Sequence, residues 1–170
     1  MTTGSTPATE ALRRAGIAFR LREYTPAPRA GRDREARPNY GAEAAEALGV
    51  GPDRVFKTLV ASVDGGRLAV GVVPVSRDLD LKRFARAVGG RRAELAPPSL
   101  AERATGYVVG GISPIGHRRR LPVVLDPSAF AHETILVSAG RRGLQVELAG
   151  SDLVRVSGAI TEAISNDDVP

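Results

Sequence analysis

The sequence predicts a compact, single α/β domain of mixed topology, with a central mixed sheet or partial barrel and helices packed around it. The length of 170 residues is enough for one hydrophobic core. Apolar periodicity indicates about seven strands and five helices. These elements do not alternate as β–α units, which disfavours a Rossmann sheet or a TIM barrel and favours a mixed sheet.

The N-terminal part is expected to form a helix, a strand, a loop and a second helix. Residues 6–15 begin with a threonine that can cap a helix and a proline suited to its first turn. Residues 17–24 alternate apolar and polar side chains, which is typical of a half-buried strand. Residues 26–39 contain three prolines and four arginines and are predicted to be a flexible loop. Residues 41–48 form a short helix that a glycine stops.

A β-hairpin is the clearest element of the middle of the chain. Residues 55–63 and 67–75 are separated by Asp-Gly-Gly, a strong turn signal. Residues 80–88 carry apolar side chains at the i, i+3, i+4 and i+7 positions of an amphipathic helix. Residues 97–105 are expected to form another short helix.

The C-terminal part is expected to contain further strands and a last helix. A central stretch, 106–126, begins with β-prone residues, continues through an irregular segment, and ends in a second β run. Residues 134–138 and 144–148 form a second hairpin. Ser151 is expected to cap a helix near 152–157, and residues 166–170 should fray. No linker or repeat is visible, so residues 1–170 are predicted to form one domain.

The composition excludes several kinds of site. Cysteine is absent, which excludes disulfides, thiolate metal sites and a cysteine nucleophile. His117 and His132 belong to no metal-binding pattern, and no G-x-S-x-G elbow is present. We therefore expect no metal and no cofactor, and we expect His117 to be solvated. No apolar run is long enough for a signal peptide or a membrane span, which favours a cytoplasmic location.

The chain is basic, with a formal net charge of +5, which favours polyanionic partners. Of its 24 basic residues, 22 are arginines, and the lysines are Lys57 and Lys82. Lys57 is the only charged residue in the apolar run 55–63, and burying an unpaired ammonium is costly. The pattern alone allows a structural lysine whose amine reaches solvent or a functional lysine that faces a cleft.

The irregular segment of the central stretch favours backbone contact with a ligand. Gly110 and Gly111 have no Cβ, so the main chain there can lie directly against a bound molecule. Successive N–H groups in such a bend can converge on a carbonyl oxygen or a phosphate. A tight loop between two strands would show the same glycines.

Three segments together resemble the YbaK/EbsC family of aminoacyl-tRNA deacylases, which is related to the editing domain of bacterial prolyl-tRNA synthetase. They are 55–60 (VFKTLV), 106–126 (GYVVGGISPIGHRRRLPVVLD) and 136–148 (LVSAGRRGLQVEL), in the expected order. The resemblance extends over about residues 11–156 and implies the same mixed fold. It also implies a bacterial trans-editing hydrolase that deacylates mischarged tRNA, foremost Cys-tRNA(Pro), with attack by the substrate thiol on its own ester.

The resemblance implies a site in which Lys57 is catalytic and holds the aminoacyl group or the terminal adenosine. The N–H groups of Gly110 and Gly111 would stabilise developing charge on the ester. The implied substrate-binding residues are Tyr24, Thr58, Gly110, Gly111, Ile112, Ser113, Pro114, Ser138 and Gln145. Gln145 departs from the aspartate that is common in the cysteine-specific branch, which leaves the amino acid open.

A set of arginines is predicted to bind tRNA around the mouth of the pocket: Arg20, Arg22, Arg83, Arg86, Arg118, Arg119 and Arg120. The expected partners are aminoacyl-tRNA and prolyl-tRNA synthetase. Two alternatives remain open: a deacylase for alanine or serine on tRNA, and a non-catalytic tRNA-binding module of the same fold.

Overall fold

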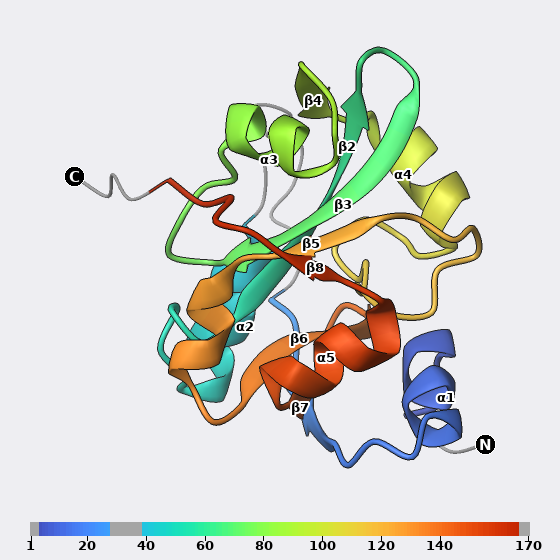
Figure 1. Cartoon of the computed structure of the whole chain (residues 1–170). Coiled ribbons are helices and arrows are strands. Elements are labelled where there is room, and N and C mark those ends of the chain that lie inside the picture. Colours follow the sequence, from blue (N-terminus) through green and yellow to red (C-terminus); the bar gives the residue numbers. More distant parts are fainter. Residues whose placement is uncertain (1–3, 28–38, 167–170) are drawn as a thin grey trace.

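The structure, a computed structural model, describes residues 4–27 and 39–166 and consists of two sheets with helices packed around them (Figure 1). The mixed α/β prediction is confirmed. The predicted loop at 26–39 and the tail at 166–170 lie largely outside the described residues. The smaller sheet has the order β1-β7-β6 and the larger one β4-β2-β3-β5-β8. The strands are β1 (Arg20–Glu23), β2 (Phe56–Val63), β3 (Arg67–Pro74), β4 (Ala93–Leu95), β5 (Val123–Leu125), β6 (Ile135–Arg141), β7 (Leu144–Leu148) and β8 (Ile160–Thr161).

Both antiparallel and parallel pairing occur in the larger sheet. Strands β2 and β3 form the predicted hairpin, in which Asp64 and Gly65 have positive φ values of 51° and 79°. Strand β5 runs parallel to both β3 and β8. A single parallel bridge between Val55 and Leu136 connects the two sheets. The strand order therefore brings β6 and β7 close to the beginning of β2.

In the described part of the chain, five α-helices surround the sheets: α1 (Pro7–Arg14), α2 (Tyr40–Leu48), α3 (Leu81–Ala87), α4 (Pro98–Thr105) and α5 (Gly150–Ser157). Thr6 caps α1 as predicted, through a capping box with Thr9. The predicted cap Ser151 is wrong, because α5 already begins at Gly150 and Ala149 makes no side-chain cap. None of the helices in the described ranges has the length and apolar character of a membrane span.

Four short segments differ from the prediction. The β-prone residues 107–109 form no strand, since Val108 is two-thirds exposed and the chain turns there. Strands β4 and β8 are too short, at three and two residues, to show a periodicity in the sequence. A 3-10 helix, η1 (Pro127–Ala131), follows β5, and its cap Asp126 also accepts hydrogen bonds from the main chain of Ile164 and Ser165.

Strand β2 separates two hydrophobic clusters, because successive side chains of a strand point to opposite faces. Phe56 and Val60 join the main core between the two sheets. Ala61 and Val63 lie on the other face and pack with Phe84 of α3. The strand is therefore fixed from both sides, which makes its backbone a rigid platform for a site.

Candidate functional site

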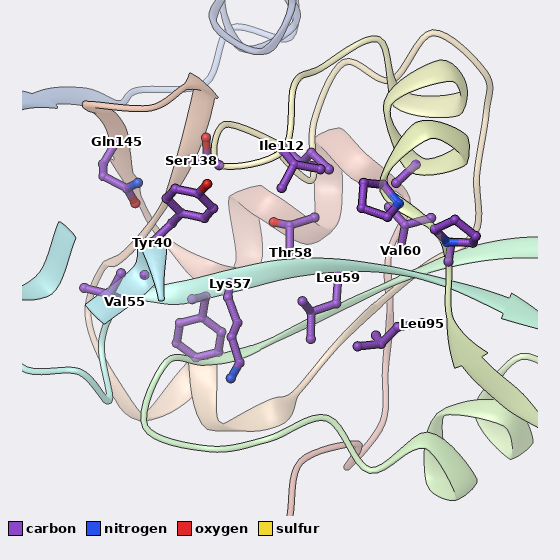
Figure 2. A pocket seen from close by; sticks show the side chains of 18 residues that line it. Tyr40, Val55, Lys57, Thr58, Leu59, Val60, Leu95, Ile112, Ser138 and Gln145 are labelled. Carbon is purple, nitrogen blue, oxygen red and sulfur yellow. The ribbon is translucent and has the colours of Figure 1, made fainter. Parts of the chain in front are cut away.

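A cavity of about 520 Å³ lies along an edge of β2 that lacks a neighbouring strand (Figure 2). Among the described residues, β4 pairs with β2 only at Ala61–Val63, so the preceding half of this edge is open. The volume falls within the range typical of small-molecule sites, roughly 300–1,000 Å³. The lining residues are Tyr40, Gly41, Val55, Phe56, Lys57, Thr58, Leu59, Val60, Leu95, Ala96, Pro97, Pro98, Ala101, Val109, Gly110, Ile112, Ser138 and Gln145.

The open edge presents main-chain groups to the cavity. The carbonyl oxygen of Val60 accepts a hydrogen bond from Ala96 N at 2.9 Å, on the side away from β3. Main-chain groups of alternate residues in a strand point to the same edge. The N–H and C=O of Thr58, two residues earlier, are therefore directed towards the cavity. A ligand there can bind by extending the sheet.

Two buried side-chain atoms in the wall of the cavity have no hydrogen-bond partner within the described part of the chain. They are Thr58 Oγ1 and Gln145 Oε1, and Gln145 as a whole is only 7% exposed. A buried polar atom without a partner costs roughly 1–3 kcal/mol. Because native structures seldom leave such groups unsatisfied, we interpret the two atoms as ligand-binding groups.

The Lys57 side chain leaves β2 on the other side from Thr58 and Ile112 (Figure 2). Its Nζ atom lies 3.5 Å from Asp78 Oδ1, and the lysine side chain is 22% exposed. Asp78 is 88% exposed, so this ion pair is weak, about 0–1 kcal/mol at most. Lys57 is thus among the residues that line the cavity, but its amine points to the face of β2 opposite Thr58, where it pairs with an exposed carboxylate that another anion can replace.

The loop that contains Gly110 and Gly111, here called the glycine loop, forms the wall opposite β2. Gly110 has a φ of 97°, a backbone conformation that strongly favours glycine. Gly111 donates its N–H to the carbonyl of Val108 at 2.8 Å. The expectation that the Gly111 N–H is free to stabilise an ester is therefore wrong, because the turn already uses it. Gly110 and Ile112 line the cavity themselves.

Two aromatic side chains hold the end of this loop. Tyr107 donates a hydrogen bond to the carbonyl of Ile115 at 2.6 Å, and His117 Nε2 lies 2.7 Å from the carbonyl oxygen of Ser113. Burial lowers the pKa of His117, and burial raises the pKa of Tyr107 to about 12. The expectation of a solvated His117 is wrong, because its ring packs edge-on to Tyr107. Both rings are neutral at pH 7.

The structure brings together most, but not all, of the predicted site residues. Lys57, Thr58, Gly110, Ile112, Ser138 and Gln145 line the cavity. Gly111, Ser113 and Pro114 are buried behind the loop wall, where they shape the loop. Tyr24 lies outside the lining, in a separate cleft with Arg141 and Arg142. Burial there raises the pKa of Tyr24.

Several lining residues were not predicted from the sequence: Tyr40, Leu95, Pro97, Pro98, Ala101 and Val109. Most are apolar, and the two prolines indicated only the beginning of a helix. Tyr40 directly follows residues 26–39, which were predicted to be a loop, and no local pattern marked it as a site residue. Only the tertiary fold brings α2 and α4 to the same opening.

The seven predicted RNA-binding arginines lie in three separate places, on β1, on α3 and in the loop before β5, and none lines the cavity. Helix α3, which carries two of them, lies at the other end of the molecule from β7 and its neighbour β1 (Figure 1). Arg22 on β1 donates to Glu147 Oε1 at 2.6 Å. Burial raises the pKa of Glu147, but hydrogen bonds from Arg22 and Thr134 outweigh it and keep that pKa below its ordinary value. Arg22 is thus already engaged in the protein.

The structure is a mixed α/β domain with a cavity at an open strand edge, and comparison with known proteins identifies its family. The family of the aminoacyl-tRNA editing domain matches residues 38–156. The chain therefore belongs to this family.

Individual relatives agree with this assignment. EbsC of Enterococcus faecalis, a proposed Cys-tRNA(Pro)/Cys-tRNA(Cys) deacylase, is 43% identical over 105 residues, which cover 62% of this chain and 64% of EbsC. The multifunctional Ser/Thr-tRNA deacylase ProXp-y of Escherichia coli is 32% identical over 59% of this chain and 63% of its own. The chain thus aligns with slightly less than two thirds of the length of each relative.

A solved structure shows the same fold. The crystal structure of a proposed trans-editing enzyme for prolyl-tRNA synthetase superimposes with a TM-score of 0.80 and 23% sequence identity. The superposition covers 98% of this chain and 99% of the other. This agreement includes nearly every element of the two sheets.

Proposed function

We propose that the protein is a trans-editing hydrolase that cleaves the ester bond of mischarged aminoacyl-tRNA, foremost Cys-tRNA(Pro). The observation that carries the proposal is the pair of unsatisfied buried atoms, Thr58 Oγ1 and Gln145 Oε1, in a cavity beside an open strand edge. Membership of the aminoacyl-tRNA editing family and the activities named for EbsC and ProXp-y support it. Incubation with a panel of mischarged tRNAs tests it.

The chemistry of the site favours catalysis by positioning. Among the described residues that line the cavity, none is a cysteine, a histidine or a carboxylate, and Lys57 is the only charged one. Ser138 Oγ accepts a hydrogen bond from Gly140 N at 3.2 Å, and the lining residues within 4–27 and 39–166 offer no general base to activate it. The main chain of Thr58 and the walls around it would instead orient the ester towards the attacking group, which is the substrate's own thiol for cysteine. Such orientation contributes roughly 7 kcal/mol or more.

Lys57 would bind a phosphate or ester oxygen of the terminal adenosine. Its amine pairs with the exposed carboxylate of Asp78, a weak partner that a ligand anion would replace. The compact ammonium has three hydrogens to donate, so it can contact several oxygens at once. The tRNA and prolyl-tRNA synthetase are the proposed partners, and partial similarity to bacterial proline–tRNA ligases supports the latter.

A deacylase for serine or another small amino acid is the second candidate. The neutral amide of Gln145 stands where a carboxylate would otherwise attract the substrate ammonium, and ProXp-y is named for serine and threonine. A hydroxyl group can also form a hydrogen bond with either Thr58 Oγ1 or Gln145 Oε1. The choice of amino acid therefore depends on how these two atoms are satisfied.

Substitution of Gln145 is expected to change amino-acid preference without abolishing hydrolysis. Gln145→Asp places a shorter, charged group at a position that is 7% exposed. Hydrogen bonds to charged groups exceed neutral ones by about 1 kcal/mol, so the ratio of kcat/KM between cysteinyl and seryl substrates should change roughly 5-fold or more. Gln145→Glu separates the effect of charge from that of length. Identical ratios in all three proteins would show that Gln145 is passive.

Binding of tRNA is expected to weaken as salt increases, because the predicted surface contacts are arginine–phosphate pairs. The log–log slope of affinity against salt should be about −0.7 for each single-strand contact. The magnitude of the slope should decrease in each of the variants Arg118→Gln, Arg119→Gln and Arg120→Gln. Arg22→Gln should have less effect because Arg22 already pairs with Glu147. Fluorescence titrations at several salt concentrations measure the slope. A flat salt dependence of the wild type would contradict the prediction.

A further inference from the structure

Tyr40, the first residue of α2, forms a wall of the cavity that the predicted site did not include. Its ring lies against Gly110, because a Cβ added to that glycine would be 3.2 Å from both Cε1 and Cζ of the tyrosine. Figure 2 shows the ring on the same side of β2 as Ser138 and Gln145. The absence of a side chain at position 110 thus allows the ring to close this side of the cavity.

Arg142 holds the Tyr40 ring in place from the outside. Its guanidinium carbon lies 5.2 Å from the ring centroid, within the range of a cation–π contact. The same guanidinium donates from Nε to Glu43 Oε1 at 3.2 Å and from Nη2 to Glu43 Oε2 at 2.7 Å. The Arg142 and Glu43 side chains are only 22% and 21% exposed, which makes this two-point ion pair well ordered.

The spacing of the helix explains why one arginine can contact both residues. Tyr40 and Glu43 are three residues apart on α2 and therefore occupy the same face. Asn39 caps this helix by accepting a hydrogen bond from Ala42 N at 3.0 Å, which fixes the direction in which α2 begins. The planar guanidinium can therefore lie over the ring and pair with the carboxylate at the same time.

Arg142 also links the ring to the polar end of the cavity. It stands between β6 and β7, the strands that carry Ser138 and Gln145. A third hydrogen bond, from Nη2 to the carbonyl of Ala27 at 3.0 Å, fixes the guanidinium further. The distance between the ring and the polar atoms of β6 and β7 is therefore set by one rigid connection.

We propose that Tyr40 limits the size of the acyl group that the cavity accepts, and that Arg142 and Glu43 are positioning residues for its ring. The proposal rests on the proposed function, since it assigns part of the cavity to the aminoacyl group. A well-packed wall discriminates against one additional methylene by roughly 10–200-fold. An aromatic ring held on two sides is such a wall.

The test compares the hydrolysis of leucyl- and alanyl-tRNA by the wild type and four variants in single-turnover experiments. Tyr40→Ala should raise the leucyl-to-alanyl ratio of kcat/KM at least ~10-fold by opening the wall. Tyr40→Phe keeps the ring and should keep the ratio. Arg142→Met should raise the ratio by a smaller factor, because the ring remains but loses its support.

The matched control is Arg13→Met. Arg13 also pairs with a glutamate, Glu10, at 2.7 Å and lies over an aromatic ring, that of Phe19 at 5.8 Å, but on α1 and outside the lining of the cavity. Its loss should leave the ratio unchanged. A ratio that Tyr40→Ala and Arg142→Met leave at the wild-type value, with the proteins folded, would overturn the proposal.

A binding measurement distinguishes failure of this proposal from failure of the proposed function. Aminoacyl-adenosine analogues with an amide in place of the ester resist hydrolysis at that bond. Their Kd values therefore show how acyl size affects binding, separately from hydrolysis. Suppose that the wild type hydrolyses neither ester but binds the alanyl amide more tightly than the leucyl amide, and that Tyr40→Ala removes this preference. That result would support the role of Tyr40 in limiting acyl size and would contradict the proposed hydrolysis. If the wild type shows no size preference in either experiment, the proposal is overturned.

Discussion

Lys57→Arg and Lys57→Ala are both expected to lose deacylation by about 100-fold or more, while the fold and tRNA binding remain nearly intact. Arginine keeps the charge and the long stem, but its flat guanidinium cannot place one donor at the position of the ammonium. A displacement of about 1 Å at a site that works by positioning is enough for such a loss. Single-turnover deacylation, thermal melting and a tRNA titration measure the three properties separately.

Asp78→Asn is the control for this prediction, because Asp78 is the partner of the Lys57 amine in the structure. If Lys57 serves the substrate, removal of an exposed carboxylate should leave the rate within about 3-fold of the wild type, given the small energy of exposed pairs. If Lys57 only forms that ion pair, Lys57→Arg should be active and Asp78→Asn should resemble Lys57→Ala. Full activity of Lys57→Arg would show that Lys57 is not a catalytic residue.

Gly111→Ala is expected to displace the loop wall and reduce activity by about 100-fold through misplacement of the ester. A Cβ at this position would lie 2.6 Å from Cα and 2.8 Å from the carbonyl carbon of Arg141. Those atoms belong to the end of β6 and cannot move without disturbing its pairing with β7. The loop must move instead, which should also lower the free energy of unfolding by about 1–3 kcal/mol.

Gly66→Ala provides a matched glycine substitution. Gly66 lies in the turn between β2 and β3, and an added Cβ would meet nothing within 4 Å. Its variant should retain both the rate and the melting temperature. Wild-type activity of Gly111→Ala would show that the exact position of the loop is unimportant to the reaction.

The elements that follow from local patterns could be predicted from the sequence, whereas those that depend on tertiary contacts could not. The capped helix α1 and the β2–β3 hairpin contain their own signals, in Thr6 and in the Asp64-Gly65 turn. Residues 107–109 have β-prone side chains but no neighbouring strand, so the chain turns instead. Strand β8 has two residues and exists only because β5 is there to pair with it.

The same distinction holds for the site. Lys57 could be found because a lone amine interrupts an apolar strand, and Thr58 and Gln145 could be found through the family motifs. The Lys57 amine points towards Asp78. This direction could not be predicted from the motif, because it depends on which face of β2 the main core covers. The role proposed for Tyr40 depends on Gly110 and Arg142, which are far from it in sequence and share no local pattern with it.

We propose that the cavity beside β2 promotes hydrolysis of the ester bond of a mischarged tRNA and so releases a small amino acid. The most direct measurement is single-turnover deacylation of a panel of labelled aminoacyl-tRNAs: cysteinyl-, alanyl- and seryl-tRNA(Pro), with prolyl-tRNA(Pro) as the correctly charged control. We predict rapid release of at least one of the three small amino acids and of cysteine first, with prolyl-tRNA(Pro) spared and with the release abolished by Lys57→Ala. If the folded protein binds tRNA but hydrolyses every substrate no faster than the spontaneous rate, the proposed function is contradicted and a non-catalytic tRNA-binding module is favoured.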